Sequence, residues 1–184
     1  MNKIIRFSIP FIAVCLMLGM LFYLAEASSR ATASLSTSNP DGSILVTTRE
    51  DELNNDGDCS LREAITAAND NTPVDACPTG DAVLTDTITF DVAGIITVTS
   101  QLSVTAGGPL VIDGGDVITT SGGGTTRVWW VDTGSELTLQ HMAVADGYIE
   151  GSGAGLYNDE GSVSVIHCVF KYNRIQNFDW RNFV

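Results

Sequence analysis

The chain has few basic residues: 9 Lys and Arg stand against 22 Asp and Glu, and the formal net charge is −13 over 184 residues. Such a chain repels the phosphates of DNA and RNA and the headgroups of anionic lipids. This argues against nucleic-acid binding and makes cations the more natural small partners. Charged residues make up only 17% of the chain, and strong helix formers other than alanine are scarce. The abundance of Val, Ile, Thr and Gly instead favours an all-β fold.

Long apolar runs are also scarce, and the one present, residues 7–24, follows two basic residues. Small-x-small sites lie at residues 25–27 and 31–33. This pattern is typical of a secretory signal peptide, so we expect residues 1–27 to be removed and the protein to be secreted or held at the cell surface. The alternative is an uncleaved anchor, because about 18 apolar residues just span a bilayer. We expect contact with a membrane only through this segment.

Cysteine is scarce, and export would leave three cysteines in an oxidising compartment: Cys59, Cys77 and Cys168. There, Cys59 and Cys77 can close a loop of about 19 residues, which contributes roughly 3 kcal/mol in the loop-entropy model. Neither has a second Cys or His at metal-ligand spacing, which argues against zinc.

A single helical segment is predicted, after a flexible Ser/Thr/Ala-rich leader at residues 28–42 and a strand candidate at residues 43–48. Ser60 and Glu63 form a capping box, in which each side chain can accept a hydrogen bond from the backbone N–H of the other residue. The residues after Ser60 place one apolar face at helical spacing: Leu61, Ala64, Ile65 and Ala68. Two to three turns are too short to be stable alone, so this helix must lie on an apolar surface.

From residue 86 onward, short β runs alternate with Gly-rich turns and contain an internal repeat. Shifting the chain by 26 residues aligns Leu137 with Val163, Leu139 with Val165 and His141 with His167, and a fainter copy precedes them. Strand, corner, strand and Gly-rich turn in about 26 residues is one coil of a solenoid. We therefore predict a parallel β-helix of about three coils over residues 81–173.

A β-helix exposes unpaired strand edges and an open core at its ends, and solenoids need terminal caps. We expect the helix after Ser60, in a cap spanning residues 43–80, to close the N-terminal end of the core.

The segment "CSLREAI", Cys59 to Ile65, with "AAN" at residues 67–69, resembles the CSLREA domain of bacterial surface and secreted proteins. Residues 151–158 and 162–173 more loosely resemble the repeats of polymorphic outer-membrane proteins. The resemblance implies a right-handed parallel β-helix, a surface-exposed or secreted role, and no catalytic activity for the CSLREA segment itself. Members of the family are usually much longer. We expect the tail, residues 174–184, to be irregular and to reflect a truncated reading frame; the alternative is a C-terminal cap.

The acidic loop before the helix resembles an EF-hand loop in spacing. Its weak calcium candidates are Glu52, Asn54, Asp56, Asp58 and Glu63, with Ser60 between them. The first position is Glu rather than Asp, no entering helix is visible, and Glu63 also belongs to the capping box. We therefore favour a solvated acidic turn, with no cofactor, and keep calcium as the alternative.

Other candidate residues have structural explanations. We expect the two repeat histidines, His141 and His167, to face outward rather than bind a metal. Five aspartates are expected to be turn residues: Asp113, Asp116, Asp132, Asp146 and Asp159. Arg127 is the one candidate base for a lyase. No two acidic residues occupy matching positions of adjacent coils; the nearest case is Asp132, which is expected above Asn158.

Two adjacent tryptophans must point to opposite faces of a strand. Because the 26-residue shift aligns Trp130 with Leu156, we predict Trp130 inside and Trp129 outside, where it can contact a sugar or a protein. The sequence as a whole favours a non-enzymatic protein of adhesion or display type, with a glycan or surface protein as partner and no catalytic residues. The alternative is a polysaccharide lyase or glycoside hydrolase of pectate-lyase type.

Overall fold

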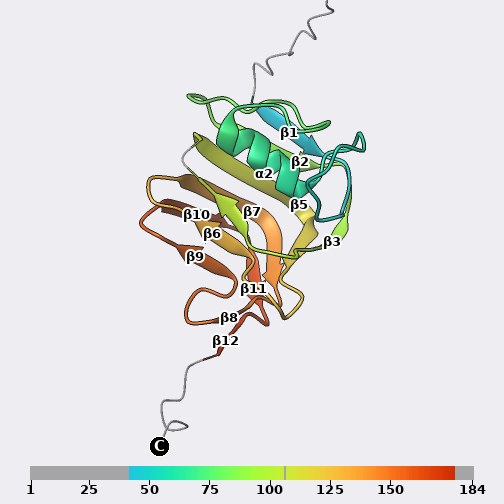
Figure 1. Cartoon of the computed structure of the whole chain (residues 1–184). Coiled ribbons are helices and arrows are strands. Elements are labelled where there is room, and N and C mark those ends of the chain that lie inside the picture. Colours follow the sequence, from blue (N-terminus) through green and yellow to red (C-terminus); the bar gives the residue numbers. More distant parts are fainter. Residues whose placement is uncertain (1–41, 106, 177–184) are drawn as a thin grey trace, which may run out of the picture. The chain divides into compact units, whose positions relative to one another are not determined.

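The computed structural model describes residues 42–105 and 107–176, which belong to one unit (Figure 1). The elements are β1 (Ser43–Val46), α2 (Leu61–Asp70), β2 (Asp86–Phe90), β3 (Gly94–Thr97), β4 (Leu102–Val104), β5 (Pro109–Ser121), β6 (Trp129–Val131), β7 (Glu136–Ala145), β8 (Tyr148–Glu150), β9 (Leu156–Asn158), β10 (Ser162–Ile166), β11 (Val169–Lys171) and β12 (Arg174–Gln176). No helix among these residues is both long enough and apolar enough to cross a membrane.

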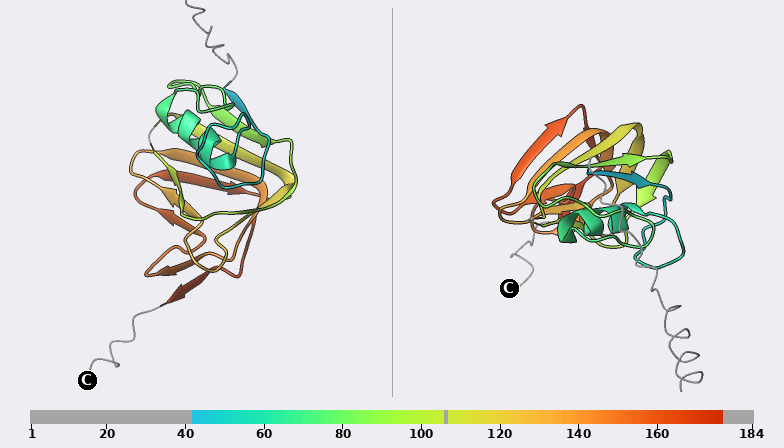
Figure 2. Two further views of the ribbon diagram at one scale, coloured as in Figure 1. Left: turned by 45° about the vertical axis from the view of Figure 1, so that its right-hand side comes forward. Right: turned by 90° about the horizontal axis from the view of Figure 1, so that it is seen from above.

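The strands form a parallel β-helix of about three turns, as predicted. The main sheet has the order β1-β2-β5-β7-β10, with β3 and β11 paired to the far halves of β5 and β7. A second sheet has the order β4-β6-β9, and β8 pairs with β12. All pairings between these strands are parallel. The views in Figure 2 show the strands of successive coils lying one above another.

The repeat recognised in the sequence sets the register of the main sheet. Leu137 pairs with Val163 and Leu139 with Val165, and the preceding coil brings Ile112 opposite Leu139. Inward side chains of equal type therefore stack in the core, since alternate residues of a strand face the same side. Ile112 and Leu139 are fully buried, whereas Val165, in the last coil, is 47% exposed.

The corners of successive coils place non-glycine residues in the left-handed backbone region. His141 and His167 have φ of 51° and 50°, and Asp146 and Tyr172 have φ of 49° and 57°. Each pair is separated by one repeat, so the same strained corner recurs in consecutive coils. The corner side chains point outward, and the two imidazole rings stack with their centroids 5.4 Å apart.

Helix α2 begins at the predicted capping box. Ser60 Oγ accepts the Glu63 N–H at 3.2 Å, and Glu63 Oε2 accepts the Ser60 N–H at 2.9 Å. The helix ends at Asn71, whose φ of 51° is left-handed. The predicted apolar face, Leu61, Ala64, Ile65 and Ala68, is buried.

The helix packs on β1 and β4, the first strands of their sheets, and on β2, and so covers the N-terminal end of the β-helix (Figure 1). The Cys59–Cys77 disulfide is present beside the helix start, with both cysteines buried.

The prediction for the two tryptophans was wrong. Trp129 pairs with Leu156 and is fully buried, and its indole N–H donates to Thr120 Oγ1 at 3.2 Å. Trp130 is half-buried on the outer face and pairs with Tyr157. The turn before β7 holds four residues, 132–135, whereas the equivalent turn before β10 holds three, 159–161. This one-residue difference shifts the register by one and reverses which face each tryptophan takes. It also places Val131, rather than Asp132, opposite Asn158.

The C-terminal boundary of the repeats differs from prediction. Residues 174–176, expected to be irregular, form β12 and pair with β8. Asn173 immediately precedes this strand. Its side-chain amide donates to Val144 C=O and accepts the Gly147 N–H, and these two bonds keep the chain in register for one more strand. The predicted signal peptide, nearly all of the leader and the rest of the tail lie outside the described residues.

Candidate ligand-binding surface

The acidic loop before α2 brings three of the calcium candidates together. One carboxylate oxygen from each of Glu52, Asp56 and Asp58 lies within 4.8 Å of the others. The Asn54 amide donates to Glu52 Oε2 at 2.7 Å and to Asp56 Oδ2 at 3.1 Å. Burial and then the neighbouring carboxylates raise the pKa of both Glu52 and Asp58 above the ordinary values. The solvated acidic turn stays the prediction for this loop, with calcium as its alternative.

The fifth candidate, Glu63, is engaged elsewhere. Its side chain is buried, and its two oxygens accept the N–H groups of Asn54 and Ser60, each at 2.9 Å. The carboxylate therefore caps the N-terminus of α2 and fixes the acidic loop next to it through the Asn54 N–H. Its separation from the cluster follows from the capping box already recognised in the sequence.

Asp113 lies next to His141, one of the two stacked histidines. Its carboxylate accepts from the Gly115 N–H, from Gln140 Nε2 at 2.8 Å, and contacts His141 Nδ1 at 3.1 Å. Burial raises the pKa of Asp113, but these hydrogen bonds and the attraction of His141 outweigh it and leave the pKa below its ordinary value. Asp132, Asp146 and Asp159 lie between strands, as predicted for turn residues. Asp113 and Asp116 instead lie within β5, where the pairing with β7 is irregular between Asp113 and Ile118.

The outer face of the β4-β6-β9 sheet carries an arginine beside two stacked aromatic rings. The Trp130 and Tyr157 rings stack with centroids 4.8 Å apart and planes inclined by 26°. The Arg127 guanidinium carbon lies 4.9 Å from the Trp130 centroid and 5.0 Å from the Tyr157 centroid. These three distances form a nearly equilateral triangle, so the guanidinium lies beside the stack.

Arg127 is only 9% exposed. Its Nε donates to Gly153 C=O, Nη2 to Ser152 C=O and Nη1 to Gln101 Oε1, at 3.0, 2.9 and 2.8 Å. All three acceptors are neutral, and no carboxylate of residues 42–105 and 107–176 forms an ion pair with it. Burial lowers the pKa of Arg127, and the charge interaction with Tyr157 opposes that shift. Arg127, the one candidate base under the lyase alternative, is thus held as a nearly buried cation.

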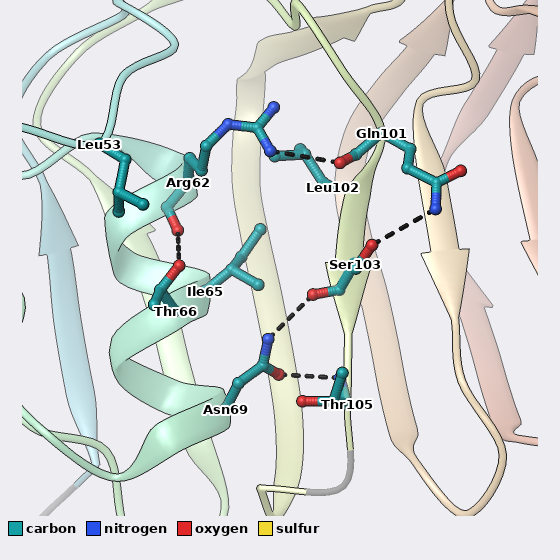
Figure 3. Close-up of a pocket in the computed structure, with 9 residues that line it drawn as sticks. All are labelled: Leu53, Arg62, Ile65, Thr66, Asn69, Gln101, Leu102, Ser103 and Thr105. Atoms are coloured by element: carbon teal, nitrogen blue, oxygen red, sulfur yellow. Dashed lines mark hydrogen bonds between the residues drawn. The ribbon is translucent and has the colours of Figure 1, made fainter.

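A groove of about 230 Å³ runs between α2 and β4, next to this face (Figure 3). It is lined by Leu53, Arg62, Ile65, Thr66, Asn69, Gln101, Leu102, Ser103 and Thr105. Ser103 pairs with Trp130 in the sheet, and Gln101 binds Arg127, so the groove and the aromatic face share a border.

Comparison with known proteins adds no relative: no family model matches the chain, and no match was found among curated proteins or solved structures. The function is therefore inferred from the residues of this chain.

Sequence reasoning identified Arg127 and the tryptophan pair but missed Tyr157, Gln101 and Ser103 as parts of the same surface. The missing signal was a one-residue gap in the repeat. Aligning Trp129 with Leu156 brings Trp130 opposite Tyr157 and would have revealed the aromatic stack.

Proposed function

We propose that this chain is an exported β-helix protein, secreted or displayed at the cell surface, that works by binding rather than catalysis. The observation that carries the proposal is the buried Cys59–Cys77 disulfide. Disulfides of this kind persist in oxidising compartments and are rare in the cytosol. The apolar run at residues 7–24, interpreted as a signal peptide, is independent support from the sequence.

The resemblance to the CSLREA domain belongs to the same proposal. The residues of this motif form the capped start of α2, the helix that covers the N-terminal end of the β-helix. The motif therefore has a structural role, because Cys59 forms the disulfide, Leu61 is buried, and Glu63 completes the capping box.

A binding role is supported over the polysaccharide lyase or glycoside hydrolase by the surroundings of Arg127. A lyase base needs an accessible nitrogen near groups that hold the substrate, and a glycosidase needs two carboxylates flanking a bond. Arg127 is instead tied to three neutral oxygens and lies beside two aromatic rings. Such a surface offers stacking and hydrogen bonding.

Export is tested by expressing the full chain in a bacterium and measuring intact mass in the cytoplasmic, envelope and supernatant fractions. We expect a mature chain that begins near Ser28 or Ser34 outside the cytoplasm. Alkylation should label one thiol before reduction, Cys168, and three after it, since Cys59 and Cys77 are joined. A full-length chain that accumulates in the cytoplasm with every thiol reactive would overturn the proposal.

Catalysis is tested separately, by incubating the purified chain with a panel of neutral and acidic polysaccharides. We expect no shortening of any polymer by mass spectrometry. Shortening that disappears when Arg127 is replaced would overturn the non-enzymatic part of the proposal.

A further inference from the structure

The two ends of the β-helix differ in how their core is covered. Helix α2 packs on the first strands, whereas β10, at the other edge of the main sheet, pairs only with β7 among residues 42–105 and 107–176. Leu139 is fully buried, but two inward side chains of the last coil, Val165 and Phe170, are 47% and 43% exposed. An open strand edge next to an uncovered apolar core is a surface on which another strand can pair.

The backbone of β10 shows which of its residues face this open edge. The Ser162 N–H donates to Ser135 C=O, on the side of β7. Successive residues of a strand direct their N–H and C=O groups to opposite sides, so Ser162 and Ser164 bond toward β7 while the groups of Val163 and Val165 face the open side. The two inward valines therefore carry the backbone donors and acceptors of the edge.

The edge lacks the features that usually prevent strand pairing between chains. Natural edge strands carry charged side chains, proline or a β-bulge. Residues 161–170 contain no Asp, Glu, Lys, Arg or Pro, and the register of β10 with β7 runs without a bulge. Nothing in this strand opposes the approach of a second strand.

The net charge of −13 makes two copies of the chain repel each other, unless they meet through a neutral surface. Residues 43–91, which include β1, α2 and β2, contain eleven acidic and two basic residues. The last coil, residues 159–176, contains two of each and is formally neutral. Strand β2 lies three strand spacings from β10, about 14 Å, and salt screens charges over about 8 Å. Contact through the last coil therefore avoids the repulsion.

The charges of the last coil are also ordered along the chain. Asp159 and Glu160 precede the uncharged segment, and Lys171 and Arg174 follow it. Two copies in antiparallel orientation bring the acidic side of each coil toward the basic side of the other, whereas a parallel orientation brings like charges together. The last coil is therefore complementary to itself about a twofold axis, as a closed dimer requires.

We propose that the last coil is a dimerisation surface, which binds the last coil of a second copy of this chain. The twofold axis passes beside Ser164, so that β10 lies antiparallel to the same strand of the other copy. In this register Val163 lies opposite Val165 of the partner subunit, and their edge-facing N–H and C=O groups exchange hydrogen bonds. The valine side chains continue the apolar core from one copy into the other.

The association is measured by analytical ultracentrifugation of the full chain between about 0.1 and 100 µM. The end of a single coil is a small interface, so we expect a monomer–dimer equilibrium with a dissociation constant on the order of 10 µM. Unfolding measured on the dilute chain then reports on the monomer, in which Val165 is exposed.

Two lysine variants locate the surface. Ser164→Lys places two like charges opposite each other on the axis and should weaken dimerisation about tenfold or more. Ser164 is exposed, so circular dichroism and the unfolding midpoint of the dilute variant should stay unchanged. The control is Ile95→Lys, which puts the same charge on a 59% exposed residue of β3 and should dimerise as the unaltered chain does.

Cross-linking tests the register. In a Cys168→Ala background, Ser164→Cys should form a disulfide-linked dimer under mild oxidation, because opposite Cα atoms of a non-hydrogen-bonded pair lie about 4.5 Å apart, within the range of disulfides. Ser162→Cys is the matched control, exposed and on the same strand. Its two copies would lie four residues apart, about 13 Å, and should not cross-link.

Three results would overturn the inference. A chain that stays monomeric at about 100 µM has no such surface at that concentration range. Association that Ser164→Lys leaves intact occurs elsewhere on the chain. Species larger than a dimer would indicate a head-to-tail contact, which does not close. The inference is independent of export and of binding to other molecules, because it is measured on the purified chain alone.

Discussion

Asn69 bonds to Thr105 as a neighbouring β-strand would. Its Oδ1 accepts the Thr105 N–H at 2.9 Å, and its Nδ2 donates to the Ser103 C=O at 2.9 Å (Figure 3). Strand β4 is the first strand of its sheet, and an open edge of this kind invites pairing with another chain. One amide side chain on α2 therefore satisfies two backbone groups of the edge and joins the cap to the β-helix.

Replacing this amide should loosen the cap. Asn69→Ala leaves the Thr105 N–H and Ser103 C=O to water, and we expect the free energy of unfolding to fall by about 1–2 kcal/mol. Urea denaturation followed by circular dichroism measures the change. The matched control is Asn55→Ala, an exposed asparagine of the acidic loop, which should change stability by less than about 0.5 kcal/mol. Equal effects of the two variants would contradict the strand-like role of Asn69.

Asp51 should make stability depend on acid pH. Its carboxylate receives two hydrogen bonds from Arg62, at 2.8 and 3.0 Å, and two from Thr99. Burial raises the pKa of Asp51, but the bonds from Arg62 and Thr99 and the guanidinium charge outweigh it, so the pKa lies below its ordinary value of 3.8. The ionised group therefore stabilises the fold above pH 3.8, and that contribution is lost as the pH falls through the lowered pKa.

The measurement is the free energy of unfolding of the unaltered chain and of Asp51→Asn between about pH 7 and pH 2, a range that spans the titration of carboxyl groups. We expect Asp51→Asn to be less stable by about 2 kcal/mol at neutral pH, because charged hydrogen bonds become neutral. The difference should shrink toward the acid end of the range. A difference that stays constant with pH would show that the charge of Asp51 contributes nothing.

The disulfide should stabilise the cap to a measurable degree. Cys59 and Cys77 are 18 residues apart in the sequence, and a loop of this size corresponds to roughly 3 kcal/mol. The double variant Cys59→Ala with Cys77→Ala should lose about that amount in urea denaturation. The control is Cys168→Ala, which removes the free, half-buried cysteine and should cost less than about 1 kcal/mol. A double variant as stable as the control would contradict the prediction.

Equivalent positions in successive coils should differ in their contribution to stability. Leu139 and Val165 pair in adjacent strands, but Leu139 is fully buried and Val165 is 47% exposed. Leu139→Ala should destabilise the fold by about 3 kcal/mol because it leaves a cavity in a packed core. Val165→Ala should cost less than about 1 kcal/mol. Comparable losses in thermal unfolding would mean that the last coil is covered in solution.

Local patterns and the repeat period could be recognised from the sequence alone. The capping box depends on two residues three positions apart, and the burial of Leu61, Ala64, Ile65 and Ala68 follows from helical spacing. The 26-residue period predicted the coils because identical spacing must bring like residues together in a parallel stack. These features can be predicted from local spacing and from the repeat, without knowing which other distant segments are in contact.

The tertiary structure decided what depends on register and on contacts between distant segments. One additional residue in the turn before β7 put Trp129 inside and Trp130 outside, because strand faces alternate with every residue. Asp51 accepts hydrogen bonds from Arg62 and Thr99, and Asn69 bonds to β4. These contacts form only when the cap packs on the β-helix, so residue spacing in the sequence does not predict them. The sequence by itself therefore determined the solenoid and its helical cap. The folded chain alone determined which side chains share the outer surface, since a one-residue difference between two turns reversed the faces that Trp129 and Trp130 take.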